Sequence, residues 1–81
     1  MNWKEHFRKL AIEHGFAEYI VIDNPTYAEV SEVVGAFLNS DGVWIAYSVD
    51  ERGSIYDEAE FSSEKEAFFE LARRLGFEDE F

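Results

Sequence analysis

Two histidines and several groups of carboxylates are the side chains of this 81-residue chain whose types could support chemistry. His6 and His14 lie eight residues apart in a stretch with helical periodicity. That spacing corresponds to a rise of about 12 Å, which is too far for the two rings to share one metal ion. Neither histidine lies near a serine in a nucleophile motif, and the chain has no cysteine. We therefore interpret both as surface residues of a helix.

The acidic residues form three local groups: Asp50-Glu51, Asp57-Glu58-x-Glu60 and Glu78-Asp79-Glu80. None of them follows the spacing of a calcium-binding loop, and neighbouring carboxylates on a strand point to opposite faces. The chain also has no glycine-rich phosphate loop of a familiar spacing. We expect no metal site, no cofactor and no enzymatic activity, and we interpret most of these carboxylates as solvated charge.

Two stretches with helical periodicity are expected to frame the fold. The first covers residues 2–14 and begins at the cap Asn2, while the second is capped by Ser62 or Ser63 and ends at Leu75. A glutamate three residues after Asn2 and after Ser63 completes a capping box in each case. Each helix is followed by a Gly-Phe pair, in which the glycine suits a left-handed helix end.

Between the helices, four segments have the composition of β-strands. They cover residues 18–23, 30–38, 43–49 and 54–61, with turn signals at Asn24-Pro25-Thr26, Asn39–Gly42 and Asp50–Gly53. The order α-β-β-β-β-α predicts an α+β fold of two layers: an antiparallel four-stranded meander with both helices on one face. We expect one domain over residues 1–81, with residues 77–81 frayed.

Strand alternation predicts which side chains face the helices and which lie on the opposite face. The residues expected to face the helices are Ile20, Ile22, Val34, Ala36, Leu38, Val43, Ile45, Tyr47, Val49, Ile55, Ala59 and Phe61. The opposite face should then hold Tyr19, Val21, Phe37, Trp44, Ala46, Ser48, Tyr56, Glu58 and Glu60. We expect this second face to be open, with aromatic rings between carboxylates.

The net charge of the chain is −11, and 16 of its 18 acidic residues lie in residues 15–81. A negative field of this size repels nucleic acids and anionic membranes and attracts basic proteins. Hydrophobic residues make up 47% of the chain and aromatic residues 17%, and this composition indicates a chain that folds. Because it has no cysteine, no signal-peptide pattern and no apolar run long enough to span a membrane, we expect it in the cytoplasm.

The predicted open face is the strongest candidate for a binding site. Trp and Tyr are enriched where proteins bind one another, and carboxylates around them would pair with Lys or Arg of a partner. The predicted partner-binding residues are Trp44, Asp50, Glu51, Tyr56, Asp57, Glu58 and Glu60. The same face could instead be covered by a second copy of the chain in a homodimer, or have no partner.

One part of the sequence resembles a known group of proteins. Trp44-Ile-Ala-Tyr-Ser-Val-Asp-Glu-Arg-Gly53 is followed by Phe61-Ser-Ser-Glu-Lys-Glu-Ala67 and a short helix. Over roughly residues 43–75, this is similar to small bacterial immunity proteins of polymorphic or contact-dependent toxin systems. In those families a strand with a Trp leads into an acidic Arg-Gly turn, and a strand ending in Phe precedes a capped helix. The resemblance implies a cytosolic antitoxin that binds and blocks its cognate toxin domain, often a basic nuclease.

Two other functions fit the same composition. A phage-encoded acidic inhibitor that mimics DNA would use the negative charge to occupy a host enzyme. A homodimeric structural or regulatory module would use the aromatic face to bind its own copy.

Overall fold

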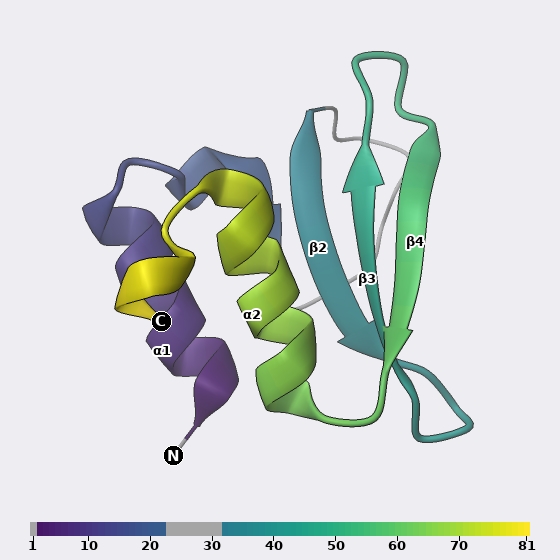
Figure 1. Cartoon of the computed structure of the whole chain (residues 1–81). Coiled ribbons are helices and arrows are strands. Elements are labelled where there is room, and N and C mark those ends of the chain that lie inside the picture. The colour runs from purple at the N-terminus through teal and green to yellow at the C-terminus, as the bar shows by residue number, and fades with distance from the viewer. Residues whose placement is uncertain (1, 23–31) are drawn as a thin grey trace.

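The computed structural model describes residues 2–22 and 32–81, which form an α+β fold of two α-helices and a four-stranded sheet (Figure 1). The elements in chain order are α1 (Trp3–Glu13), the 3-10 helix η1 (Ala17–Tyr19), β1 (Ile20–Val21), β2 (Val33–Leu38), β3 (Trp44–Val49), β4 (Ile55–Phe61), α2 (Glu64–Leu75) and the 3-10 helix η3 (Glu78–Glu80). The turn predicted at residues 24–26 and the start of the strand predicted at 30–38 lie outside the described residues.

Both helices begin as their sequences predict. The Asn2 side chain accepts a hydrogen bond from the Glu5 N–H at 3.1 Å, and the Ser63 hydroxyl accepts one from the Glu66 N–H at 3.2 Å. These bonds satisfy backbone donors that the first turn of a helix leaves without a partner. Gly76 ends α2 with a φ of 91°, a left-handed conformation that glycine adopts at little cost.

The sheet is mixed, and the predicted antiparallel meander is therefore wrong at its first strand. The strand order is β1-β2-β3-β4, and both β2–β3 and β3–β4 are antiparallel. β1 instead pairs with β2 in parallel, with Ile20 opposite Val34. A parallel pair needs a long crossover between its strands, and the interval between Val21 and Val33 is close to that length. The prediction treated this interval as a tight turn followed by more strand.

The two faces of β3 are the reverse of the prediction. Trp44 and Ala46 belong to the core cluster that α1 and α2 share, whereas Tyr47 and Val49 form a second buried cluster with Val33. The opposite face of the sheet is thus not an open aromatic surface at these positions. Alternation failed as a guide because β3 is buried along almost its whole length, so its sequence has no polar face.

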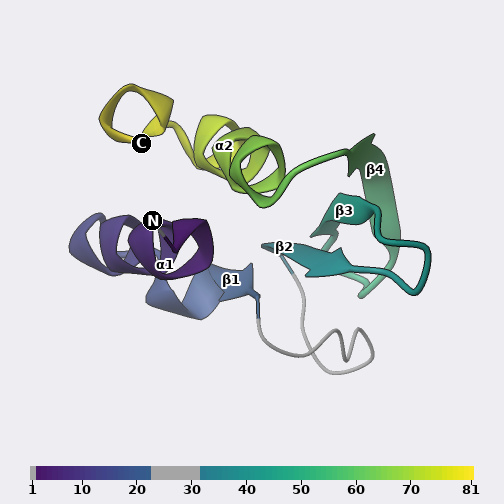
Figure 2. The same cartoon turned by 90° about the horizontal axis from the view of Figure 1, so that it is seen from below.

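α2 packs on the sheet, and α1 packs on α2. α2 contacts β2, β3 and β4, and α1 packs mainly against α2. Figure 1 shows α2 between α1 and these three strands, and the view from below shows α1 beside η1 and β1 (Figure 2). Small residues on the strands, Ala36 and Ala46, allow the large side chains of the helices to approach the sheet. Phe7, Phe68 and Leu71 are completely buried as a result.

The C-terminal residues are docked on α1, although we expected residues 77–81 to fray. Phe77 is buried, and its ring stacks on His14 at 4.9 Å between centroids. Nε2 of His14 lies 2.5 Å from a carboxylate oxygen of Glu80, and Nε2 of His6 lies 3.0 Å from the carbonyl oxygen of Phe81. Both histidines therefore hold the end of the chain and are not isolated surface side chains.

Within the described residues, the helices have 11 and 12 residues, and none is long and apolar enough to cross a membrane.

Candidate functional site: an acidic pocket at one edge of the sheet

The ends of five elements meet at one edge of the sheet. Because β1 and β2 are parallel, both begin at this edge. β3 is antiparallel to β2 and ends there, and β4 begins there after a short turn. α2 also ends on this side, at Leu75 (Figure 1). The partial negative charge of a helix C-terminus therefore lies near this edge.

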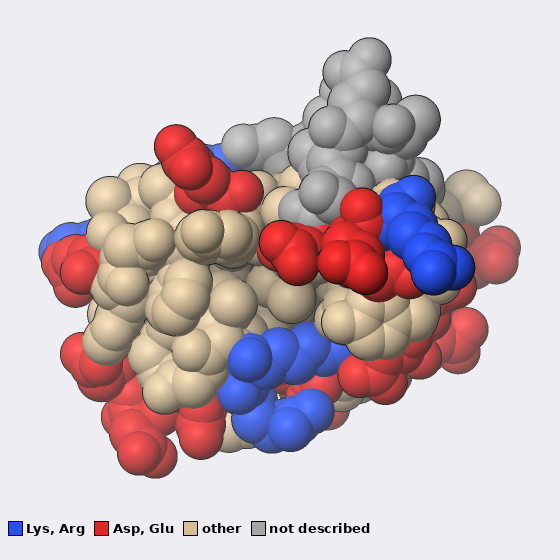
Figure 3. All heavy atoms as spheres, turned by 90° about the horizontal axis from the view of Figure 1, so that it is seen from above, with Lys and Arg blue, Asp and Glu red and all other residues tan. Residues whose placement is uncertain are grey.

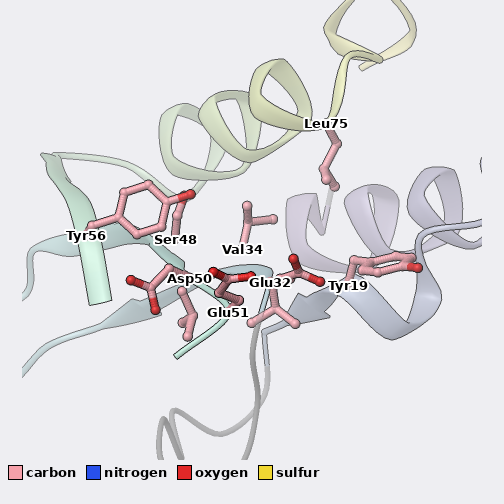
Figure 4. A pocket seen from close by; sticks show the side chains of 10 residues that line it. Tyr19, Glu32, Val34, Ser48, Asp50, Glu51, Tyr56 and Leu75 are labelled. Carbon is pink, nitrogen blue, oxygen red and sulfur yellow. The ribbon is translucent and has the colours of Figure 1, made fainter. Parts of the chain in front are cut away.

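A pocket of about 430 Å³ opens between these ends (Figure 4). Its described lining consists of Tyr19, Glu32, Val33, Val34, Ser48, Val49, Asp50, Glu51, Tyr56 and Leu75. This volume lies within the range of about 300–1,000 Å³ that is usual for sites that bind small groups. All seven Lys and Arg of the chain are among the described residues, and none of them lines the pocket.

Three carboxylates contribute to the pocket, and hydrogen bonds hold the side chain of Asp50 and the backbone of Glu32. Oδ1 of Asp50 accepts hydrogen bonds from the N–H groups of Arg52 and Ser54, each at 2.9 Å, so Asp50 is held in its turn. Glu32 donates its N–H to the carbonyl of Asp50 at 3.2 Å and has a φ of 56°, which is uncommon outside glycine. Neither Glu32 nor Glu51 forms an ion pair with another described residue.

Two tyrosines border the same pocket. Tyr19 is 46% exposed and Tyr56 is 53% exposed, so both rings remain accessible to a partner. Figure 4 shows the carboxylates between the two rings, and Val34 and Leu75 on the side toward the helices. The pocket therefore combines accessible rings, apolar side chains and negative charge.

A buried arginine holds α2 to the strands beside the pocket. Arg74 is only 8% exposed and donates to the Ser48 hydroxyl at 2.9 Å and to the Asp57 carbonyl at 2.6 Å. Its Nε also donates to the Glu70 carboxylate at 2.7 Å, and its guanidinium lies 3.7 Å from the Asp57 carboxylate. A buried charge is stable only when it is paired and hydrogen-bonded, and these partners meet that need. Arg74 is thus already engaged by two acidic residues.

Glu70 joins Arg74 to a second arginine on the surface of α2. Arg73 donates to both carboxylate oxygens of Glu70, at 2.8 and 2.6 Å. These hydrogen bonds are the main cause that lowers the pKa of Glu70 from 4.5 to about 2; burial opposes them, and Arg74 adds to the lowering. The same contact raises the pKa of Arg73. Glu70 is consequently ionised across the physiological range and compensates the arginines beside the pocket.

Figure 3 looks down on this edge and shows acidic side chains gathered over it, with basic side chains at the border of the group. Two other hollows of about 400 Å³ differ in their charge. One is lined by Phe61, Lys65, Glu66, Phe69 and Glu70, and the other by Glu5, Arg8, Lys9, Ile12 and Glu13. Both include basic residues, whereas the pocket at the sheet edge does not.

Three of the predicted site residues, Asp50, Glu51 and Tyr56, come together in the pocket. Trp44 does not: it packs against Phe68 of α2, with 5.6 Å between ring centroids, and belongs to the core cluster on the helix side. The prediction that Trp44 lies on a face away from the helices is therefore wrong.

A bulge in β4 explains why Tyr56 reaches the pocket. Ala46 pairs with Ala59, but Ser48 pairs with Tyr56, so two residues of β4 lie opposite Tyr47. The extra residue reverses the alternation of β4 on the two sides of the bulge. Tyr56 thus lies on the side of Ser48, toward the end of α2, and not on the face away from the helices that the prediction gave it.

The remaining predicted residues lie elsewhere on β4. Asp57 forms the bulge with a φ of 54° and contacts Arg74 through its backbone and its carboxylate. Glu58 and Glu60 are exposed, and Glu60 lies opposite Ile45 on the face away from α2. None of these three carboxylates lines the pocket.

Sequence reasoning missed Glu32 as a candidate, and it placed Tyr19 on a sheet face and not in a pocket. Both reach this edge only because β1 runs parallel to β2, and no local pattern in the sequence shows that direction. The sequence did indicate that Asp50 and Glu51 lie close together at one end of the strands, because the predicted Asp50–Gly53 turn joins β3 and β4 at this edge.

Among the described residues, no three His, Asp or Glu side chains are close enough together to hold a metal ion. What the pocket offers a ligand is therefore separate carboxylates and aromatic rings, which suit an organic cation. No protein-family model, curated protein or solved structure matches this chain.

Proposed function

We propose that this chain is a binding protein without enzymatic activity, and that it is an antitoxin which neutralises a basic bacterial toxin domain in the cytoplasm. The observation that carries the proposal is the pocket at the sheet edge, where Glu32 and Glu51 have no ion-pair partner among the described residues and two tyrosines are half exposed. Such a surface is complementary to a nuclease active site, which is positively charged because it binds phosphate.

The physical roles of charge and rings in this proposal differ. The net charge of −11 attracts a basic partner and can raise its association rate by about 10–10³-fold. Tyr19 and Tyr56 would then be buried in the complex and slow its dissociation. Trp44 does not contact the partner in this proposal, because it packs against Phe68 of α2.

The proposal takes both helices to cover one face of the sheet, so that the partner approaches the edge at which β1, β2 and β4 begin. It includes neither direct binding of nucleic acid, nor a membrane, a metal or a cofactor. The resemblance of residues 43–75 to immunity proteins supports the antitoxin over a DNA mimic. The homodimer alternative depended on an open aromatic face of the sheet, and Trp44 of that predicted face packs in the core cluster on the helix side.

The test is to co-express the chain with the product of the adjacent gene and to purify both. An antitoxin should form a 1:1 complex with that product, block its nuclease activity, and dissociate more readily as the salt concentration rises. An adjacent gene that encodes no toxin, or a toxin that stays fully active in the presence of the chain, would contradict the proposal.

A further inference from the structure

The pocket at the sheet edge has three features that a group of surface carboxylates alone lacks: an open hollow, aromatic borders and an apolar wall. Its volume of about 430 Å³ is large enough for a side chain of a partner. Val34 and Leu75 provide apolar surface on the helix side, and Tyr19 and Tyr56 provide two rings. A ligand that fits these features carries a positive charge on a long apolar stem.

The apolar wall suits the stem of a long basic side chain. Lys and Arg both carry methylene groups that pack against apolar surface while the charged end remains near polar atoms. Val34 and Leu75 lie on one side of the pocket, and the carboxylates of Glu32 and Glu51 lie between the tyrosine rings (Figure 4). The charged end of such a stem would therefore reach the carboxylates while its methylene groups contact the wall.

The borders of the pocket distinguish a guanidinium from an ammonium group. A guanidinium is planar, stacks on aromatic rings and directs N–H groups to several acceptors at once. Tyr19 and Tyr56 offer rings, and Glu32 and Glu51 offer carboxylates that no described residue pairs. An ammonium is a compact and strongly hydrated charge that gains less from such rings.

We infer that this pocket receives one arginine side chain of the protein partner. The inference rests on the proposed function and names the group that its site recognises. Glu32 and Glu51 bind the guanidinium, Tyr19 and Tyr56 border it from opposite ends of the pocket, and Val34 and Leu75 contact its methylene groups. Asp50 contributes charge, while one of its carboxylate oxygens remains in its turn.

The test uses three short peptides and needs no identified partner. Acetyl-Gly-Arg-Gly-amide, the same peptide with Lys, and the same peptide with citrulline are titrated into the 15N-labelled chain and followed by NMR. Citrulline has nearly the shape of arginine but no charge. We expect saturable shifts at Glu32, Asp50, Glu51, Tyr19 and Tyr56 with the Arg peptide, binding several-fold weaker with Lys, and none with citrulline.

Matched variants separate this site from general attraction to an acidic protein. Glu32→Gln with Glu51→Gln should weaken binding of the Arg peptide by about tenfold, because charge-assisted hydrogen bonds are lost. Glu13→Gln with Asp41→Asn removes the same charge from exposed positions outside the pocket and should change it less than about twofold. If Glu32→Gln perturbs folding, Glu32→Asn offers a residue that tolerates the left-handed backbone at this position.

Equal affinity for the Arg and Lys peptides, shifts spread over all exposed carboxylates, or equal effects of the two double variants would overturn the inference. These outcomes leave the antitoxin proposal open to its own test, since a toxin could still bind the edge through other groups. Conversely, specific binding of the Arg peptide together with an unaffected toxin would remove the antitoxin proposal and keep the arginine site.

Discussion

At the scale of single residues, close packing between Gly35 and Tyr47 fixes the register of β2 and β3. The two residues lie directly opposite each other, and Tyr47 is only 1% exposed. A Cβ added at Gly35 would lie 2.4 Å from the Tyr47 ring and 2.6 Å from the carbonyl oxygen of Val21. Only glycine leaves room for the ring at this position.

Gly35→Ala is therefore expected to lower the free energy of unfolding by about 2 kcal/mol or more, as overpacking of a core does. Gly42→Ala is the control, because no atom lies within 4 Å of the added Cβ and only the left-handed backbone, at a φ of 79°, opposes it. Its cost should be about 1 kcal/mol. Urea denaturation measures both variants, and equal losses would show that the ring contact does not matter.

Local residue patterns predicted the helix caps and singled out Asp50, Glu51 and Tyr56, but not the other residues that line the pocket. Asn2 and Ser63 were recognisable because a cap acts on a backbone group three residues away. Tyr19 and Glu32 join the pocket through strand pairing between distant residues, and their neighbours in the sequence do not show it.

At the scale of elements, Arg74 connects α2 to both β3 and β4. It donates to Ser48 on β3 and to Asp57 at the bulge of β4, and it pairs with Glu70 one turn earlier. Removing one partner of a buried charge network leaves the others without compensation. The orientation of α2 on the sheet, and so the place of Leu75 in the pocket, depends on these contacts.

Arg74→Met should accordingly reduce the free energy of unfolding by about 3 kcal/mol or more. Arg73→Met is a close control, because Arg73 shares the partner Glu70 but its side chain is 56% exposed. Solvent screens the contact between Arg73 and Glu70, so this control should lower stability clearly less than Arg74→Met. Similar losses in the two variants, measured by thermal and chemical unfolding, would show that the buried network is not what holds α2.

The pKa of Glu70 predicts how this connection depends on pH. The pKa is lowered from 4.5 to about 2 in the folded chain, so its contribution is fully present above about pH 4.5 and is lost as the pH falls toward 2. The difference in unfolding free energy between the wild type and Glu70→Gln should be about 1–3 kcal/mol at neutral pH and shrink over that interval. A difference that stays constant from pH 7 to pH 2 would mean that the carboxylate charge of Glu70 does not stabilise the fold.

The two helices and the antiparallel pairing of β2, β3 and β4 could be predicted, whereas the parallel direction of β1 and the faces of β3 could not. Periodicity and turn residues act locally and specify an element. The side of β3 that faces α2 depends on which face accommodates the helices, and Ala46 on one side allows closer approach than Tyr47 on the other. The bulge at Asp57 likewise arises from pairing and reverses the side of Tyr56.

At the scale of the whole molecule, the surplus of negative charge is a cost to the isolated chain and an advantage in a complex. Like charges on a compact chain repel one another, and a net charge of −11 is large for 81 residues. A basic partner would relieve this repulsion when it binds. The isolated chain and the complex should therefore respond to salt in opposite directions.

Raising the sodium chloride concentration from about 0.05 to 0.5 M should increase the melting temperature of the isolated chain by a few degrees, because salt screens the repulsion between carboxylates. The variant pair Glu32→Gln and Glu51→Gln should show a smaller increase. A melting temperature that falls with salt would indicate that attraction between opposite charges dominates in the free protein.

An NMR footprint of the adjacent gene's product on the 15N-labelled chain shows whether a basic protein binds at the acidic edge of the sheet. We predict that the amides of Tyr19, Glu32, Ser48–Glu51 and Tyr56 shift or broaden, with α1 unaffected. A footprint confined to the outer surface of α1, with these residues unchanged, would contradict it.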